Sequence, residues 1–305
     1  RLKYVIDVNR EAAAALAAQH GAQVADVDGA FGDASIGATV ICSSTDTHSE
    51  LILKSAAAGK HIFCEKPVDL SLERARACRE NTKASGKPIM IGFNRRFDPN
   101  FSAMKAALDA GEIGKPELLS ITSFDPAPPP IAYVKVSGGL FRDMMIHDFD
   151  MANFMMGEAP VSIMAAGSSI VDAEIGAAGD VDTAAVTMTY ADGRICVIKN
   201  SRRAVYGYDQ RVELLGAEGL LQAQNMLENT LVKSTAAGVT GAKPTYFFLE
   251  RYMPSYAKEW GAFVDALTGG TALPVTLDDG ITALAMAEAA TTSSKTGQPV
   301  RLADV

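Results

Sequence analysis

The chain has 305 residues, 48% of them hydrophobic and 21% charged, and its formal net charge at pH 7 is -8. This length suits one large domain or two medium ones. The acidic balance argues against a nucleic-acid or anionic-membrane partner, because no basic surplus is present to meet phosphate groups.

The four cysteines, Cys42, Cys64, Cys78 and Cys196, form no C-x-x-C pair and support neither a zinc site nor a disulfide framework. We therefore expect free thiols in a cytoplasmic protein, and no apolar run approaches the roughly 18 residues of a membrane span.

The first part of the chain alternates between predicted strands and predicted helices. A strand over residues 1–7 leads into an Ala-rich helix that Asn9 caps and Gly21 ends. Further strands are predicted at 40–42, 61–64 and 88–92, with helices at 48–59 and 71–86. Strands that alternate with helices of this length predict βαβ units and a parallel sheet.

The pattern changes near residue 100, where Asp98-Pro99 is a helix start with proline at the first helical position. Hairpins or antiparallel pairs are predicted at 183–199 and 211–224, and helices at 254–267 and 279–294. We therefore expect a nucleotide-binding α/β domain over residues 1–118. An α+β domain with a large, mostly antiparallel sheet should follow over residues 119–305.

Asp7 ends a hydrophobic strand and precedes a helix. In a dinucleotide-binding domain an acidic residue at this place bonds the adenosine ribose, and Val8 beside it offers no cation for a 2′-phosphate. Both residues favour NAD over NADP, although acidic residues are common at strand ends. The glycine-rich turn that normally lies about 20 residues earlier is not found, because six residues precede Asp7. We expect that the printed chain lacks the first strand, the glycine loop and the first helix of such a domain.

The stretch from Gly138 to Gly157 carries the strongest chemical signal. Asp143 and His147 stand four residues apart in a segment with helical spacing of its apolar residues, which predicts that both side chains lie on one helix face. A carboxylate on one ring nitrogen selects the tautomer and leaves the other nitrogen for a substrate. The ordinary alternative is a surface pair of an acid and a histidine.

Three other residues are candidates for contact with a substrate. Lys66 follows a predicted parallel strand, where ligands usually bind in open α/β sheets, and its ammonium can stabilise a developing alkoxide. Arg96 is expected at the same sheet edge, and Tyr206 can supply a hydroxyl, although each is also explained as a surface or structural residue. No metal is expected at His147, because no second histidine stands at ligand spacing.

The motifs resemble those of the glucose–fructose oxidoreductase/inositol dehydrogenase/rhizopine-catabolism (Gfo/Idh/MocA) family over nearly the whole chain. The matching stretches are residues 4–8, 60–67, 92–97, 138–150 and 204–211. A Glu-Lys-Pro motif followed at this distance by G-G-x-x-x-D-x-x-x-H is specific for the family. The R-D-M-x-I-H-D-F-D-M form is similar to that of the inositol-oxidising branch.

The resemblance implies an N-terminal Rossmann domain with a doubly wound parallel sheet, a C-terminal domain with a large open sheet, and a homotetramer. Lys66, Asp143 and His147 match the catalytic triad of the family. Cofactor contacts are implied at seven positions, which are Asp7, Val8, Ser43, Ser44, His48, Glu65 and Lys66. Arg96 and Tyr206 match positions that face the polyol.

The expected function is NAD-dependent oxidation of a polyol, with myo-inositol oxidised at carbon 2 as the first choice. His147 would take the hydroxyl proton while hydride passes from the same carbon to NAD. One alternative is a sibling dehydrogenase for scyllo-inositol or another sugar. Another is a non-catalytic NAD-binding regulator, since a fold does not by itself define a function. The presence of all three triad residues argues against the regulator.

Overall fold

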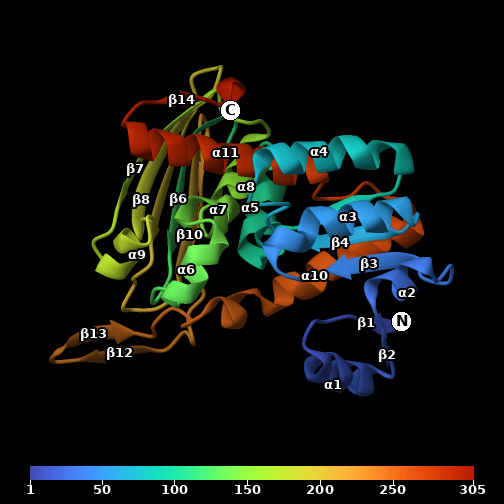
Figure 1. Cartoon of the computed structure of the whole chain (residues 1–305). Coiled ribbons are helices and arrows are strands. Elements are labelled where there is room, and N and C mark those ends of the chain that lie inside the picture. Colours follow the sequence, from blue (N-terminus) through green and yellow to red (C-terminus); the bar gives the residue numbers. More distant parts are fainter. The chain divides into compact units, whose positions relative to one another are not determined.

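The structure is a computed structural model that describes residues 1–305. Figure 1 labels its helices and strands, which belong to two compact units. The first unit comprises residues 1–92 and 262–281, and the second comprises residues 93–261 and 282–305. This division lies before the boundary expected near residue 118, because helix α5 (Pro99–Asp109) packs on strand β11 (Gly219–Ala223) of the second unit. None of the helices combines the length and hydrophobicity that a membrane span requires.

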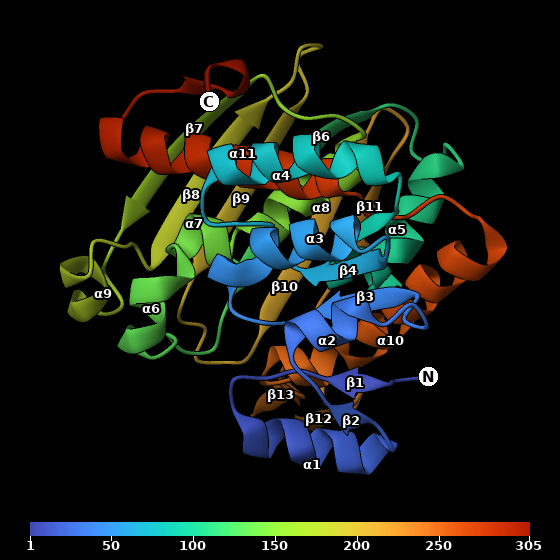
Figure 2. The ribbon, with the colours of Figure 1, turned by 45° about the vertical axis from the view of Figure 1, so that its right-hand side comes forward.

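The first unit contains parallel strands and the helices that follow them. Its strands are β1 (Tyr4–Val5), β2 (Gln23–Val24), β3 (Ala38–Ile41), β4 (His61–Glu65) and β5 (Ile89–Gly92). Its helices are α1 (Arg10–His20), α2 (Val27–Gly32), α3 (His48–Ala57) and α4 (Leu72–Thr82). β1 pairs with β2, and β4 lies between β3 and β5. α3 lies against β3 and β4, and α4 packs on α3 (Figure 2). The predicted parallel pairing is therefore confirmed, and the strands form two small sheets, β1-β2 and β3-β4-β5.

Local capping explains where the helices begin. The Asn9 side chain accepts hydrogen bonds from the backbone of residues 11 and 12, and Gly21 ends α1 in the left-handed conformation. Ser71 caps α4 in the same way. Asp98 accepts from the first backbone amides of α5, whose first residue is Pro99. These cap residues confirm the starts predicted from the sequence.

The second unit is built on a seven-stranded sheet with the order β11-β10-β6-β9-β8-β7-β14. The remaining strands of this sheet are β6 (Pro116–Phe124), β7 (Ser162–Ser168), β8 (Thr183–Thr189), β9 (Ile195–Ser201), β10 (Asp209–Gly216) and β14 (Val300–Arg301). Every neighbouring pair is antiparallel except β6 and β9. The prediction of a large, mostly antiparallel sheet is confirmed.

The two faces of this sheet differ in burial. Ala184, Val186 and Met188 of β8 are buried, whereas the alternate residues along the strand are exposed. Helices lie along the buried face, as Figure 1 shows for α7, α8 and the second part of α11. Besides α5, the helices of this unit are α6 (Ile131–Ser137), α7 (Leu140–Asp143), α8 (Ile146–Met156) and α9 (Ala173–Ala177), with parts of α10 (Phe248–Gly269) and α11 (Leu277–Thr296). No helix of the second unit covers the other face of this sheet.

Three segments differ from the expectations. The helix predicted from Pro254 begins at Phe248, so the proline lies inside α10. The single helix predicted before Gly157 is broken into α7 and α8, because the amide of Met145 bonds to Leu140 O, five residues earlier, and widens the turn. A separate hairpin of β12 (Val232–Thr235) and β13 (Gly238–Gly241) extends from the second unit (Figure 1).

The beginning of α11 packs closely against the sheet of the first unit. Gly280 is buried, and a Cβ atom there would lie 2.7 Å from Val68 Cγ2 and 3.2 Å from Ile91 Cγ1. Val68 and Ile91 are themselves fully buried, so neither can move into solvent. Gly261 in α10 is different, because a Cβ atom there meets nothing within 4 Å.

We expect Gly280→Ala to lower the free energy of unfolding by about 1–3 kcal/mol, the usual cost of overpacking a core. The matched control, Gly261→Ala, should be neutral or raise it by up to about 1 kcal/mol, because alanine favours helix. Urea denaturation followed by circular dichroism measures both. If the two substitutions change the free energy of unfolding equally, the close contact of Gly280 with Val68 does not exclude a side chain at position 280.

Candidate active site

The residues expected to contact the cofactor lie at the carboxyl ends of parallel strands in the first unit. Asp7 follows β1, and its Oδ1 accepts a hydrogen bond from Asn9 N at 2.7 Å, which fixes the carboxylate next to its own backbone turn. The side chain of Val8 is fully exposed. An exposed carboxylate at this strand end, beside an apolar neighbour, suits the hydroxyls of an adenosine ribose.

His48 joins the loop that follows β3 to the loop that follows β4. It is 1% exposed, with Nε2 3.0 Å from Ser43 O and Nδ1 2.7 Å from Pro67 O. Within the first of these loops, Ser43 Oγ and Thr47 Oγ1 are 2.6 Å apart, and Thr47 Oγ1 donates to Ser44 O at 2.7 Å. The imidazole therefore holds two strand ends together, and this arrangement places Ser43 and Ser44 next to the Lys66–Pro67 turn.

Glu65 and Lys66 end β4 side by side. Burial raises the pKa of the Glu65 carboxyl, and the neighbouring charge of Lys66 opposes this shift. Gly92 on β5 leaves the space that Glu65 occupies, because a Cβ atom there would lie 3.0 Å from Glu65 Oε2. Lys66 is partly exposed at this edge of the sheet.

These residues fit NAD. An exposed Asp7 follows β1, a serine pair follows β3, and Glu65-Lys66 ends β4, all at carboxyl ends of parallel strands, where dinucleotides bind in open α/β sheets. The structure therefore brings Ser43, Ser44 and His48 into one hydrogen-bonded group with the Lys66–Pro67 turn.

Asp143 and His147 lie in the second unit, on either side of the break between α7 and α8. Asp143 Oδ1 accepts a hydrogen bond from Tyr133 Oη at 2.8 Å, and its Oδ2 lies 3.8 Å from Nη2 of Arg202. The His147 ring packs edge-on against Phe93, with 6.0 Å between the ring centroids. The relative orientation of the Asp143 and His147 side chains is therefore determined by the break in the helix and not by a regular helical spacing.

Sequence reasoning did not single out Tyr133 or Arg202. Tyr133 lies just after a run of prolines, and Arg202 lies in a Ser-Arg-Arg sequence that reads as an ordinary strand end. Arg202 is 1% exposed, and the burial of an arginine close to acidic residues is the structural feature that marks it. Local sequence does not reveal that burial, because β9 and α7 are far apart in the chain.

The acidic residues after His147 are held by two buried arginines. Arg95 Nη1 lies 2.6 Å from Asp148 Oδ1, and Arg96 donates to Asp150 through Nε at 2.9 Å and Nη2 at 2.5 Å. All four side chains are between 0% and 8% exposed. Arg96 was expected to face a polyol, and in the structure its guanidinium is paired with Asp150.

Tyr206, the other expected polyol contact, is 44% exposed and donates its hydroxyl to Asp209 Oδ2 at 2.6 Å. Burial, with the hydrogen bond to Asp209, raises the pKa of Tyr206 to about 12. Asp209 is itself buried and also accepts from Arg211 Nε at 2.7 Å. The Tyr206 hydroxyl therefore stays protonated and can still accept a hydrogen bond from a ligand hydroxyl.

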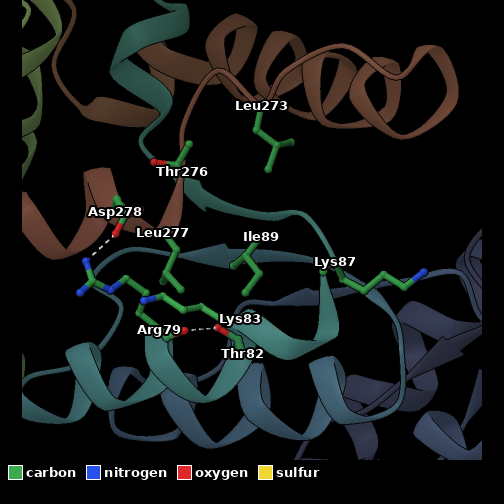
Figure 3. A pocket seen from close by; sticks show the side chains of 10 residues that line it. Arg79, Thr82, Lys83, Lys87, Ile89, Leu273, Thr276, Leu277 and Asp278 are labelled. Atoms are coloured by element: carbon green, nitrogen blue, oxygen red, sulfur yellow. Dashed lines mark hydrogen bonds and ion pairs between the residues drawn. The ribbon is translucent and has the colours of Figure 1, made fainter.

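A surface pocket of the first unit lies elsewhere. Figure 3 shows it between the end of α4 and the segment that leads into α11, with Arg79 and Lys83 at the lower left, Lys87 at the right and Leu273 above. Arg79 pairs with Asp278 at 2.9 Å. None of the residues expected to bind cofactor or substrate lines this pocket.

Comparison with known proteins identifies the family of the chain. Residues 1–93 match the model of an oxidoreductase family with an NAD-binding Rossmann fold, and residues 101–222 match the model of the GFO/IDH/MocA C-terminal domain. The chain is 46% identical to an inositol 2-dehydrogenase of Rhizobium meliloti, over 96% of this chain and 89% of the relative. It is 49% identical to a myo-inositol 2-dehydrogenase of Thermotoga maritima, over 90% of this chain and 82% of the relative.

Solved structures show the same likeness. A myo-inositol dehydrogenase from Corynebacterium glutamicum superposes with a TM-score of 0.95 at 40% identity, covering 99% of this chain and 91% of that chain. A scyllo-inositol dehydrogenase from Lactobacillus casei, solved with NAD(H) and scyllo-inositol, gives a TM-score of 0.91 at 27% identity, with coverage of 99% and 92%. The chain therefore belongs to the Gfo/Idh/MocA family of oxidoreductases, and its N-terminal part is an NAD-binding Rossmann fold.

Proposed function

We propose that this protein is an NAD-dependent dehydrogenase that oxidises myo-inositol at carbon 2 to the corresponding ketone. The observation that carries the proposal is the pair Asp143 and His147 at the junction of α7 and α8, with Asp143 bonded to a hydroxyl and beside a buried guanidinium. A carboxylate held in this way, four residues before a histidine, is suited to support general base catalysis by the imidazole. The identity of 46% to an inositol 2-dehydrogenase over almost the whole chain supports this choice of substrate.

Cofactor binding is assigned to the first domain, residues 1–118 as expected from the sequence. Asp7 would bond the ribose and, with Val8, select NAD over NADP, since neither residue attracts a 2′-phosphate. Cofactor contacts at the nicotinamide end are proposed for Ser43, Ser44, His48, Glu65 and Lys66. When bound, NAD accepts the hydride that leaves carbon 2.

Chemistry on the substrate is assigned to three side chains. His147 takes the proton of the reacting hydroxyl, and Asp143 orients the ring and stabilises the imidazolium that forms. Lys66 donates a hydrogen bond to the reacting oxygen and stabilises the negative charge that develops on it. No residue in this scheme needs a metal, because the proton goes to a side chain and the hydride to the cofactor.

Substrate binding is assigned to the second domain, residues 119–305, together with Arg96. Tyr206 can accept a hydrogen bond from a polyol hydroxyl while it donates to Asp209. Arg96 contributes mainly by fixing Asp150, because the ion pair already occupies its Nε and Nη2.

A sibling activity is the second candidate. The Lactobacillus casei structure holds scyllo-inositol on a fold with a TM-score of 0.91, so a change of isomer needs no change of fold. Turnover with myo-inositol, scyllo-inositol and glucose in parallel separates these substrates. A non-catalytic regulator is disfavoured, because Lys66, Asp143 and His147 are all present.

His147→Ala should reduce the rate of NAD reduction by myo-inositol by about a hundred- to ten-thousandfold, the usual effect of removing a general base. In the unchanged protein kcat/KM should rise with pH as the imidazole loses its proton, and this limb should vanish in the variant. NADH absorbance measures the rate across the pH range.

His20→Ala is the matched control, because His20 is exposed at the end of α1 and should not affect turnover. Asp143→Asn should also lose rate, since an amide orients an imidazole without stabilising its charged form. Near-normal turnover in His147→Ala would refute the mechanism.

We also propose that the protein assembles as a homotetramer through the open face of its large sheet. On that face Val197 of β9 stands between Ser120 of β6 and Thr187 of β8. Two further exposed apolar residues on this face are Ile195 and Leu118, which are paired in the register of β9 and β6. An open face that carries apolar residues among charged ones such as Lys199 and Glu213 is suited to association with a second sheet, most simply with D2 symmetry.

Val197→Glu should break the tetramer, because it places an added charge on the open face at a position that would be buried between the two sheets. Val264→Glu, at an exposed position of α10, is the matched control and should leave assembly unchanged. Sedimentation equilibrium gives the mass of each species. If the unchanged protein is a monomer at every concentration tested, the assembly proposal is wrong.

A role in polyol catabolism in the cytoplasm is proposed on chemical grounds. Oxidation of inositol with NAD as acceptor yields NADH and a ketone, which suits a degradative reaction. The four cysteines are free thiols, as a reducing compartment would keep them. The substrate is a neutral polyol, and no nucleic-acid or membrane partner is proposed.

A further inference from the structure

Asp143 is held from two elements that are distant from it in sequence. Tyr133 on α6 donates its hydroxyl to Oδ1 at 2.8 Å, and Arg202, which follows β9, places Nη2 3.8 Å from Oδ2. Each carboxylate oxygen therefore faces a different partner. Two partners on opposite oxygens restrict rotation of the carboxylate more than either would alone.

Arg202 also connects the two ends of α7. Its Nη2 lies 3.7 Å from Asp180 Oδ2, and Asp180 accepts a hydrogen bond from the amide of Leu140, the first residue of α7, at 2.9 Å. Gly139 makes this approach possible, because a Cβ atom there would lie 2.7 Å from Asp180 Oδ1. One buried guanidinium thus faces the carboxylate at the start of α7 and the carboxylate at its end. A buried cation of this kind favours the charged form of its acidic neighbours.

Tyr133 is the accessible member of the group. It is 46% exposed, whereas Arg202 is 1% exposed. Partial burial and the adjacent charge of Asp143 raise the pKa of the Tyr133 hydroxyl, so it keeps its proton and stays a donor at neutral pH. A hydroxyl that donates to a carboxylate draws part of the negative charge towards itself.

We propose that Tyr133 is a positioning residue for Asp143 in the dehydrogenase reaction, an inference that rests on the proposed function. Its hydrogen bond holds the carboxylate in one orientation and moderates the negative charge that Asp143 directs at His147. Without the hydroxyl, Asp143 turns more freely and its full charge stabilises the imidazolium. His147 would then release its proton at a higher pH.

Every charged or titratable group near Asp143 enters this balance. Tyr133 of α6 and Arg202 after β9 contact Asp143, Asp180 before β8 faces the same guanidinium, and His147 of α8 follows Asp143 by four residues. Asp125 at the end of β6 is coupled to Asp143 and to Arg202, and burial raises its pKa to about 6. Because Asp125 also titrates in this pH range, the titration of His147 itself, read separately from the rate, isolates the effect of the Tyr133 hydroxyl.

The test is Tyr133→Phe, which removes one oxygen and keeps the ring. We expect kcat with myo-inositol to fall about tenfold, in line with the loss of a hydrogen bond to a charged group, while KM and NAD binding change by less than about twofold. The acid limb of the kcat/KM profile should move to higher pH. Tyr246→Phe, on a tyrosine that is 58% exposed and lies after β13, is the matched control and should match the parent.

A second readout does not depend on turnover. The chain has four histidines, so the ring signals of a histidine-labelled sample are few, and the signal missing in His147→Ala assigns His147. Its titration by nuclear magnetic resonance should shift to higher pH in Tyr133→Phe. If myo-inositol is not oxidised, the proposed function fails, yet this titration still decides the role of Tyr133. An unshifted His147 titration, or an equal loss of rate at every pH with an unshifted limb, would overturn the proposal.

Discussion

The second unit depends on two buried ion pairs. Arg95 and Arg96, in the turn just after β5, hold Asp148 and Asp150 of α8, and the four side chains are almost completely buried. Loss of one partner from such a pair leaves a buried charge and typically costs about 3–5 kcal/mol. Because Asp148 directly follows His147, the arginines also determine where the candidate base stands. The stability of the unit and the geometry of its candidate site therefore rest on the same contacts.

The break between α7 and α8 extends this dependence to Asp143. α7 is a single short turn, too short to be stable alone, and its start is capped by Asp180. Its end carries Asp143, which Tyr133 and Arg202 approach from two other elements. The carboxylate and the imidazole are thus oriented by separate supports that meet at the break. In the first unit His48 performs a comparable task, since its two ring nitrogens join the loops after β3 and β4.

Much of the fold was predictable because its signals are local. Asn9, Ser71 and Asp98 cap helices through hydrogen bonds within three residues, and the strand alternation of β8 appears directly in its burial. The start of α10 is not evident from the sequence, because proline is typical of a first helical turn, whereas this helix continues through Pro254. The break after Asp143 was missed because the apolar spacing on either side suits a continuous helix.

The sequence by itself determined the family, the α/β character of the chain and the chemical identity of the candidate residues Lys66, Asp143 and His147. These follow from motifs and from short-range backbone preferences. Tertiary structure alone decided that Arg96 pairs with Asp150, and that Tyr133 and Arg202 converge on Asp143. The reason is physical. A buried charge is satisfied by whichever group the packing of distant elements brings within reach, and sequence spacing carries no record of that partner.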